Sequence, residues 1–79
     1  MRLVECVPNF SEGRDRQKIE SIVNAIKESG EVRVLDVDPG EATNRTVVTF
    51  VGEPEAVVEA ALAGMRKAAE VIDMRLHHG

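Results

Sequence analysis

The stretch that decides the fold is EVRVLDVDPGEATNRTVVTFV, residues 31–51. It holds two valine-rich runs, Glu31 to Val37 and about Asn44 to Val51, separated by Asp38-Pro39-Gly40-Glu41. Short runs rich in β-branched residues are typical of strands, and Pro followed by Gly marks a turn. The stretch therefore predicts two strands joined by a tight connection, the second running back along the first.

Successive side chains of each predicted strand point to opposite faces of the sheet. In the first, Val32, Val34 and Asp36 are predicted to share one face, and Arg33, Leu35 and Val37 the other. In the second, one face carries Val47, Thr49 and Val51, and the other Thr46, Val48 and Phe50. Both faces of the second strand are partly apolar, which predicts that it packs on two sides.

Helices are predicted before and after this strand pair. Ile19, Ile22, Val23 and Ile26 follow the i, i+3, i+4, i+7 spacing of one helix face, with Asp15 or Ser11 as the cap and Gly30 at the end. After Gly52, Glu53-Pro54-Glu55 opens a second helix that runs to about Asp73. Its apolar stripe consists of Val57, Val58, Ala61, Leu62, Met65, Ala68, Ala69 and Ile72. Residues Met74 to Gly79 are expected to form a short tail.

Arg2 to Val7 reads as a further strand, ended by Pro8, and Pro8 to Gly13 as a turn. The order is then βαββα, an α+β chain in which two helices cover one face of a three-stranded sheet. A right-handed crossover makes this an incomplete ferredoxin-like two-layer sandwich without its closing strand. The last strand would lie between the other two, so the edge of the first strand stays unpaired. That edge predicts a partner, either a second copy or a domain outside these residues.

Composition limits the class of protein. The chain has 79 residues with 14 acidic and 10 basic side chains, a net charge of −4, two phenylalanines and no tryptophan or tyrosine. This length allows one domain. Scattered basic residues and two aromatics argue against nucleic acid, and no apolar run approaches the roughly 20 residues of a membrane span. The lone Cys6 cannot form an intramolecular disulfide, and the N-terminus lacks a signal peptide, so a cytoplasmic location is expected.

The topology gathers polar residues at one end of the sheet: Asn9, Asp38, Asn44, Arg45 and the tail residues His77 and His78. Amides, a carboxylate and a guanidinium suit a small zwitterionic or carboxylated ligand, because Arg can bind a carboxylate with two hydrogen bonds. Each residue also has a structural interpretation. Asn9 suits a turn, Asp36 and Asp38 suit a strand end, and Arg45 suits a solvated charge. Adjacent His77 and His78, without a third ligand, make a poor metal site, so none is predicted.

Several segments resemble one family. They are VECVPNFSEGR (4–14), LDVDPG (35–40), NRTV (44–47), VGEPE (51–55), and IDM (72–74) with HHG (77–79). In this order and without gaps they closely resemble the start of the N-terminal subdomain of glutamate formiminotransferases, which occur alone or fused to a cyclodeaminase. The resemblance implies transfer of a formimino group between N-formiminoglutamate and the co-substrate tetrahydrofolate. It also implies two ferredoxin-like subdomains that form a cleft for the folate.

The resemblance also implies that residues 1–79 form a single partial subdomain, from which some functional residues of the family are missing. In the family, the histidine assigned as general acid/base lies two residues beyond Gly79, so no catalytic residue is predicted here. Asn9, Asp38, Asn44 and Arg45 are carried over as substrate-binding residues for folate or a glutamate-type molecule. Two hypotheses follow. The chain is a piece or short homologue of the transferase with little turnover alone, or it is a non-catalytic homo-oligomeric binding or assembly module.

Overall fold

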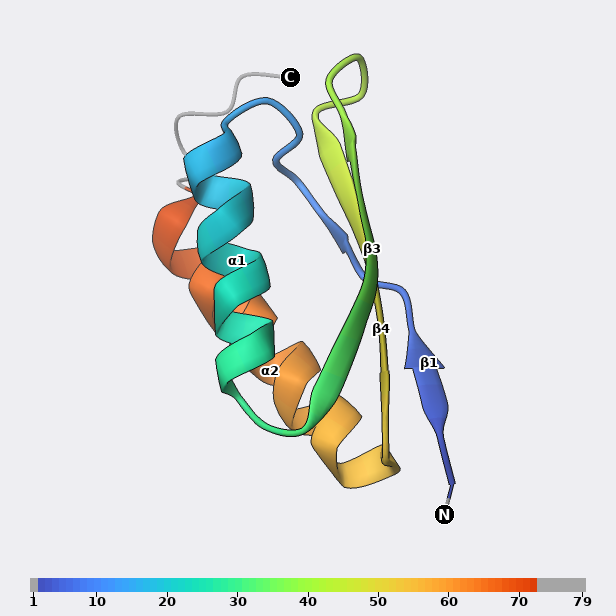
Figure 1. Cartoon of the computed structure of the whole chain (residues 1–79). Helices are drawn as coiled ribbons and strands as arrows, with labels where there is room; N and C mark the ends of the chain where they lie inside the picture. The colour runs from blue at the N-terminus through green and yellow to red at the C-terminus, as the bar shows by residue number, and fades with distance from the viewer. Residues whose placement is uncertain (1, 73–79) are drawn as a thin grey trace.

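The computed structural model describes residues 2–72 and shows an α+β fold. Its elements in chain order are β1 (Val4–Cys6), β2 (Asn9–Phe10), α1 (Arg16–Glu28), β3 (Val32–Gly40), β4 (Arg45–Gly52) and α2 (Pro54–Val71). Both helices lie on the same side of one antiparallel sheet (Figure 1). The predicted tail, Met74 to Gly79 with His77 and His78, lies outside the described residues, as does Asp73, where α2 was predicted to end.

Strand β4 lies in the middle of the sheet. β3 pairs with β4 along its whole length, and β1 and β2 pair with successive parts of its other edge. The prediction that the last strand separates the first two is therefore confirmed. The ferredoxin-like assignment, which needs a further strand, stays a prediction.

The sheet has four strands rather than the predicted three, because the first strand is divided at Pro8. The pairing register does not change across the break, since Cys6 lies opposite Phe50 and Asn9 lies opposite Val47. Between them, the backbone nitrogen of Val48 donates to the carbonyl of Pro8 at 3.1 Å. Pro8 has no N–H with which to return that hydrogen bond, so the ladder is interrupted. The predicted turn from Pro8 to Gly13 was therefore wrong at Asn9 and Phe10, which form β2.

The predicted alternation of β3 was also wrong, because the strand contains a bulge at Leu35. Val34 lies opposite Phe50 and Asp36 lies opposite Thr49, so Leu35 is an extra residue in the ladder. A bulge reverses the alternation of the residues after it. Val37 consequently packs against the core together with Val32 and Val34, whereas Asp36 lies on the other face.

The connection between β3 and β4 lies later in the chain than predicted. Asp38, Pro39 and Gly40 belong to β3, and the turn comprises residues 41–44. The backbone nitrogen of Asn44 donates to the Glu41 carbonyl at 3.3 Å. Asn44 has a φ of 53°, a left-handed conformation that asparagine tolerates better than most residues.

The core lies between the sheet and the helices. Phe50, Val48 and Ile26 are fully buried there, and Phe10, Ile19, Ile22, Val23, Val57, Ala60 and Ile72 complete the buried apolar cluster. Asp15 caps α1 as predicted, since its carboxylate accepts from the backbone nitrogens of Gln17 and Lys18. Gly64 allows α2 to approach α1 closely, because a Cβ there would lie 2.9 Å from Cγ1 of Ile26.

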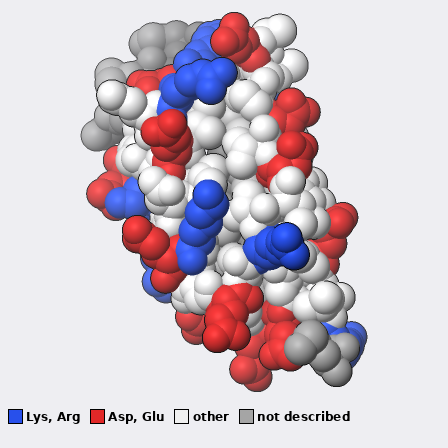
Figure 2. All heavy atoms as spheres, viewed as in Figure 1, with Lys and Arg blue, Asp and Glu red and all other residues white. Residues whose placement is uncertain are grey.

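The surface along one edge of the two layers carries mixed charge. Figure 2, which has the helices on the left and the sheet on the right, shows basic and acidic side chains interspersed and separated by uncharged surface. Among residues 2–72, neither helix has the length and apolar character required to cross a membrane.

Candidate functional site

A shallow hollow lies on the face of the sheet that the helices leave uncovered. We call it the open-face hollow. It has a volume of about 430 Å³ and is lined by Asn9, Asp38, Gly40, Thr43, Arg45 and Val47. Its position follows from β4, whose buried Thr46, Val48 and Phe50 alternate with half-buried Val47, Thr49 and Val51. Since Val48 and Phe50 belong to the core under the helices, the Val47 side chain lies on the opposite, open face.

The sheet register brings three of the four predicted binding residues to this hollow. Val47 of β4 pairs with Asn9 of β2 at one edge and with Asp38 of β3 at the other. The three side chains therefore form one row across the open face. Arg45 lies two pairs further along, opposite Gly40, and therefore on the same face of the sheet. Asp38 reaches this face because of the bulge at Leu35, since an unbroken alternation from Val34 would have directed it toward the helices.

The fourth predicted residue, Asn44, lies beside the hollow but does not line it. Its Oδ1 atom accepts a hydrogen bond of 2.9 Å from the backbone nitrogen of Gly13. Gly13 has no room for a side chain, because a Cβ there would lie 2.6 Å from the backbone nitrogen of Arg45 and would also contact the carbonyl oxygen of Gly40. Asn44 therefore holds the loop before α1 against the 41–44 turn, which carries Thr43 and leads into Arg45 at the start of β4.

Two buried polar side chains reinforce this contact. The Thr46 hydroxyl donates to the carbonyl of Glu12, and Thr46 is only 2% exposed. The Glu12 carboxylate accepts from the backbone nitrogens of Arg14 and Asp15 at 3.2 and 3.0 Å. Nζ of Lys18 lies 3.8 Å from the other Glu12 oxygen. We call these contacts, together with the hydrogen bond from Gly13 to Asn44, the loop clamp.

Sequence reasoning missed Glu12, Thr46 and Thr43. Glu12 and Thr46 form the loop clamp, and Thr43 lines the open-face hollow. A buried acid has no local signature, because its partners are backbone nitrogens that only the folded loop presents. Thr43 could have been found, since it lies in the connection directly before Asn44 and Arg45.

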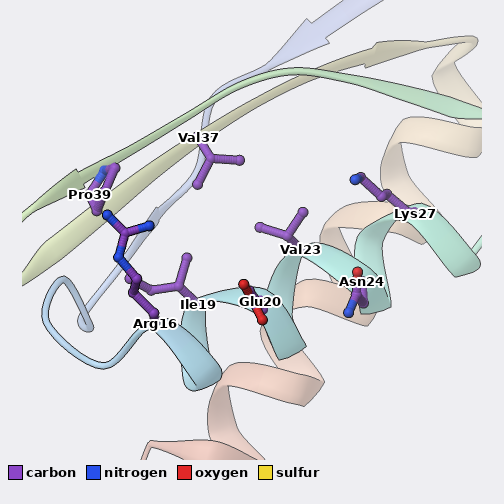
Figure 3. A pocket seen from close by; sticks show the side chains of 8 residues that line it. All are labelled: Arg16, Ile19, Glu20, Val23, Asn24, Lys27, Val37 and Pro39. Atoms are coloured by element: carbon purple, nitrogen blue, oxygen red, sulfur yellow. The ribbon is translucent and has the colours of Figure 1, made fainter.

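A second and larger hollow, which we call the α1 groove, lies between α1 and β3. It has a volume of about 620 Å³ and contains none of the predicted residues. Figure 3 shows Arg16 and Lys27 toward its two ends, with Glu20 and Asn24 from the same helix; Ile19, Val23, Val37 and Pro39 complete its lining. Ile19 and Val23 are buried core residues, whereas Arg16, Glu20, Asn24 and Lys27 are exposed on α1.

The open-face hollow carries one guanidinium, Arg45, and one carboxylate, Asp38, a pair that suits a small ligand with both charges. Asp38 and Arg45 are both exposed at its rim. Within residues 2–72, ion pairs join Lys18 to Glu12 and Lys67 to Glu70, so neither Asp38 nor Arg45 is neutralised there. Among the same residues, no three His, Cys, Asp or Glu side chains are grouped closely enough to hold a metal ion.

Comparison with known proteins gives one family. The family model described as the formiminotransferase domain, N-terminal subdomain, matches residues 3–79. A formimidoyltransferase-cyclodeaminase of Rattus norvegicus is 56% identical over 78 residues, which are 99% of this chain and 14% of that protein. A glutamate formimidoyltransferase of Thermoplasma acidophilum is 52% identical over 79 residues, 100% of this chain and 26% of that protein.

A more distant glutamate formimidoyltransferase, from Streptococcus pyogenes serotype M1, is 41% identical over 78 residues, again 26% of its length. The chain thus spans between 14% and 26% of the length of these curated relatives. The family model covers the 4–14 segment and the β3–β4 pair, which together carry the residues that line the open-face hollow. The chain belongs to the formiminotransferase family, and its match lies in the N-terminal subdomain.

Proposed function

We propose that this chain supplies one wall of the substrate cleft of a folate-dependent glutamate formiminotransferase. The observation that supports the proposal is the convergence of Asn9, Asp38 and Arg45 at the open-face hollow. The family membership supports tetrahydrofolate as the co-substrate in this proposal. A volume of about 430 Å³ lies near the lower end of the range for small-molecule sites, roughly 300–1,000 Å³, and suits a glutamate-sized molecule better than a whole folate.

The side chains of the hollow match the chemistry of the transfer. The folate amine adds to the formimino carbon to give a charged tetrahedral adduct. The attacking nitrogen then loses a proton, and the bond from that carbon to the glutamate nitrogen breaks as a proton is delivered to the glutamate nitrogen. The Arg45 guanidinium can bind a glutamate carboxylate with two parallel hydrogen bonds. The Asp38 carboxylate can stabilise positive charge on the adduct, and the Asn9 amide can orient a polar substrate group.

We propose that turnover needs the further length that the relatives possess, since this chain spans at most 26% of them. Holding two substrates in register accounts for much of the advantage in a group transfer, and one wall of a cleft cannot hold both. The chain alone is therefore expected to bind weakly and to turn over little or not at all.

Titration of the isotopically labelled chain with N-formiminoglutamate, followed by amide chemical shifts, tests the site. We expect shifts at Asn9, Asp38 and Arg45 that saturate, and an Arg45→Gln variant that weakens binding about tenfold, the range for loss of a charged hydrogen-bonded partner. Arg33→Gln is the matched control, because Arg33 lies opposite Val51 toward the other end of β3. Equal effects of the two variants would contradict a site at Arg45.

Turnover is tested by mixing the chain with the remaining length of the Thermoplasma acidophilum relative, starting after the residue aligned with Gly79. We expect formimino-tetrahydrofolate to form only in the mixture. If neither folate binding nor product formation appears in a mixture whose two parts associate, the proposal is wrong.

The second candidate is a non-catalytic homo-oligomeric binding or assembly module. It is favoured by the outer edge of β1 and β2, which pairs with no other strand within residues 2–72, and by half-buried Val47 and Val51 on the open face. It predicts oligomers without binding of either substrate. The cytoplasmic location stays a prediction.

A further inference from the structure

Gly40 is a glycine that its own backbone conformation does not require. It is the last residue of β3 and pairs with Arg45, although the sequence predicts it in a turn. Its φ lies outside the left-handed region, so any residue could adopt the same backbone conformation. Glycine in a strand lacks a side chain to pack, and it often marks a place where another backbone or a ligand approaches closely. One of these two neighbours should therefore account for Gly40.

The place of the missing side chain is largely open. A Cβ on Gly40 would lie 2.9 Å from Oγ1 of Thr43 and 3.2 Å from the carbonyl oxygen of Arg45. Apart from the chain neighbours of Gly40, no third heavy atom in the described part of the chain lies within 4 Å of it. Gly13 is the opposite case, because three backbone atoms lie within 2.7 Å of its Cβ position. Close approach of a loop therefore explains the glycine at position 13 but not the one at position 40.

This open place belongs to the open-face hollow. Gly40 follows Asp38 by two residues and pairs with Arg45, so a side chain at position 40 would project on the same open face. Thr43 and Arg45, which are nearest to the Cβ position, also line the hollow. A side chain at position 40 would therefore occupy room that the hollow now offers to a ligand beside Arg45.

We propose that Gly40 determines the length of the ligand that the hollow accepts. The inference rests on the proposed function, in which Arg45 binds a carboxylate and Asp38 faces the positive charge of the formimino group. Their two rows are two residues apart along β4, which is about 7 Å. An extended glutamate side chain covers this span, and its carboxylate reaches Arg45 over the bare Cα of Gly40.

The test compares two ligands, N-formiminoglutamate and N-formiminoaspartate, which is shorter by one methylene. Amide chemical shifts give both dissociation constants for the wild-type chain and for Gly40→Ala. One methylene in a fitted pocket changes affinity about 10–200-fold, so the wild-type chain should bind the longer ligand at least about tenfold more tightly. In Gly40→Ala the longer ligand should lose about tenfold in affinity and the preference should disappear.

The fold should tolerate these changes. The hydrogen bond from the exposed Thr43 hydroxyl to the Gly40 carbonyl is 3.4 Å long, so that hydroxyl can turn away from an added methyl group. Thr43→Leu is an independent second variant, because it narrows the same place from the turn without changing β3. It should also abolish the preference for the longer ligand. Circular dichroism shows whether each variant is folded.

Gly52→Ala is the matched control. A Cβ there would lie 3.0 Å both from the carbonyl oxygen of Glu31 and from Cγ1 of Val32, at the other end of β4. It tests the effect of a tight methyl group on the sheet and should leave the preference unchanged. An equal loss of preference in Gly52→Ala would overturn the inference, because strand stability would then determine the preference.

The remaining outcomes separate this inference from the function on which it rests. If the wild-type chain binds N-formiminoglutamate at the hollow and its preference persists in folded Gly40→Ala and Thr43→Leu, the inference alone is wrong. If the wild-type chain binds both ligands equally, Gly40 does not select length and the inference is again wrong. If neither ligand gives saturable shifts at Asn9, Asp38 and Arg45, the proposed function fails together with the inference.

Discussion

Replacing Gly13 by alanine should destabilise the protein strongly, because the loop clamp closes over the position of the missing Cβ. That atom would lie 2.6 and 2.7 Å from the backbone nitrogen and oxygen of Arg45 and would also contact the carbonyl of Gly40. These neighbours are backbone atoms of paired strands and cannot rotate away. Forced overpacking costs about 1–3 kcal/mol, and displacement of the hydrogen bond from Gly13 to Asn44 adds about 0.5–1.5 kcal/mol. A loss of about 2–4 kcal/mol is expected.

Urea unfolding followed by far-ultraviolet circular dichroism measures this loss, since the chain has no tryptophan or tyrosine for fluorescence. A chain of this size has a total stability of only about 4–12 kcal/mol, so the change is a large fraction of it. Gly30→Ala is the matched control, because no heavy atom lies within 4 Å of a Cβ at Gly30. It should be neutral or stabilising by up to about 1 kcal/mol. If the two variants unfold at the same urea concentration, the steric reasoning is refuted.

Two further substitutions in the loop clamp should show graded effects in the same urea assay. Thr46→Val removes the donor to the buried Glu12 carbonyl and should cost about 1–3 kcal/mol, whereas Thr49→Val on the open face should change stability by less than about 0.5 kcal/mol. Equal losses of stability in Thr46→Val and Thr49→Val would show that the hydrogen bond of the Thr46 hydroxyl does not stabilise the fold. Asn44→Ala loses both the acceptor for Gly13 and the tolerance of a φ of 53°, and should cost about 1–3 kcal/mol. Asn44→Asp keeps an oxygen acceptor and should retain most of the stability; a loss as large as that of Asn44→Ala would contradict the role of the hydrogen bond.

Local pattern was enough to predict the helices and the order of elements. The isoleucine spacing from Ile19 to Ile26 identifies the buried face of α1, and Pro54 marks the start of α2. These signals are strong because burial repeats every three or four residues along several turns. The central position of β4 followed from the short connection to β3 and the crossover through α1.

The break in the first strand and the bulge in β3 were not predictable, because each depends on a single residue. Pro8 interrupts the first strand without changing its register, and Leu35 changes the register of β3 without interrupting it. A proline after a valine-rich run looks like the end of a strand from sequence alone, and a leucine in a strand gives no sign that it is unpaired. The alternation from Val32 consequently failed beyond Val34.

For the candidate site, chain topology was sufficient to bring Asn9, Asp38 and Arg45 to one end of the sheet. It could not separate residues that line the hollow from residues that support it. Asn44 has the same polarity and almost the same position as Arg45, yet its amide oxygen binds the loop before α1. Whether a small polar residue at a turn faces a ligand or a backbone nitrogen depends on the path of a loop some thirty residues away.

The extra residue at Leu35 links the length of β3 to the chemistry of both sheet faces. The span from Val34 to Asp38 has one residue more than the span from Phe50 to Val47 that it pairs with, so a regular pairing of the full-length strand would turn Asp36 and Asp38 into the apolar layer and expose Val37. Loss of the extra residue, with both ends of the strand held in place, would instead give a regular strand that keeps Val37 in the core and Asp38 beside Asn9. In this family, an alignment gap of one residue at that point would therefore signal a strand without the bulge and with the same open-face surface.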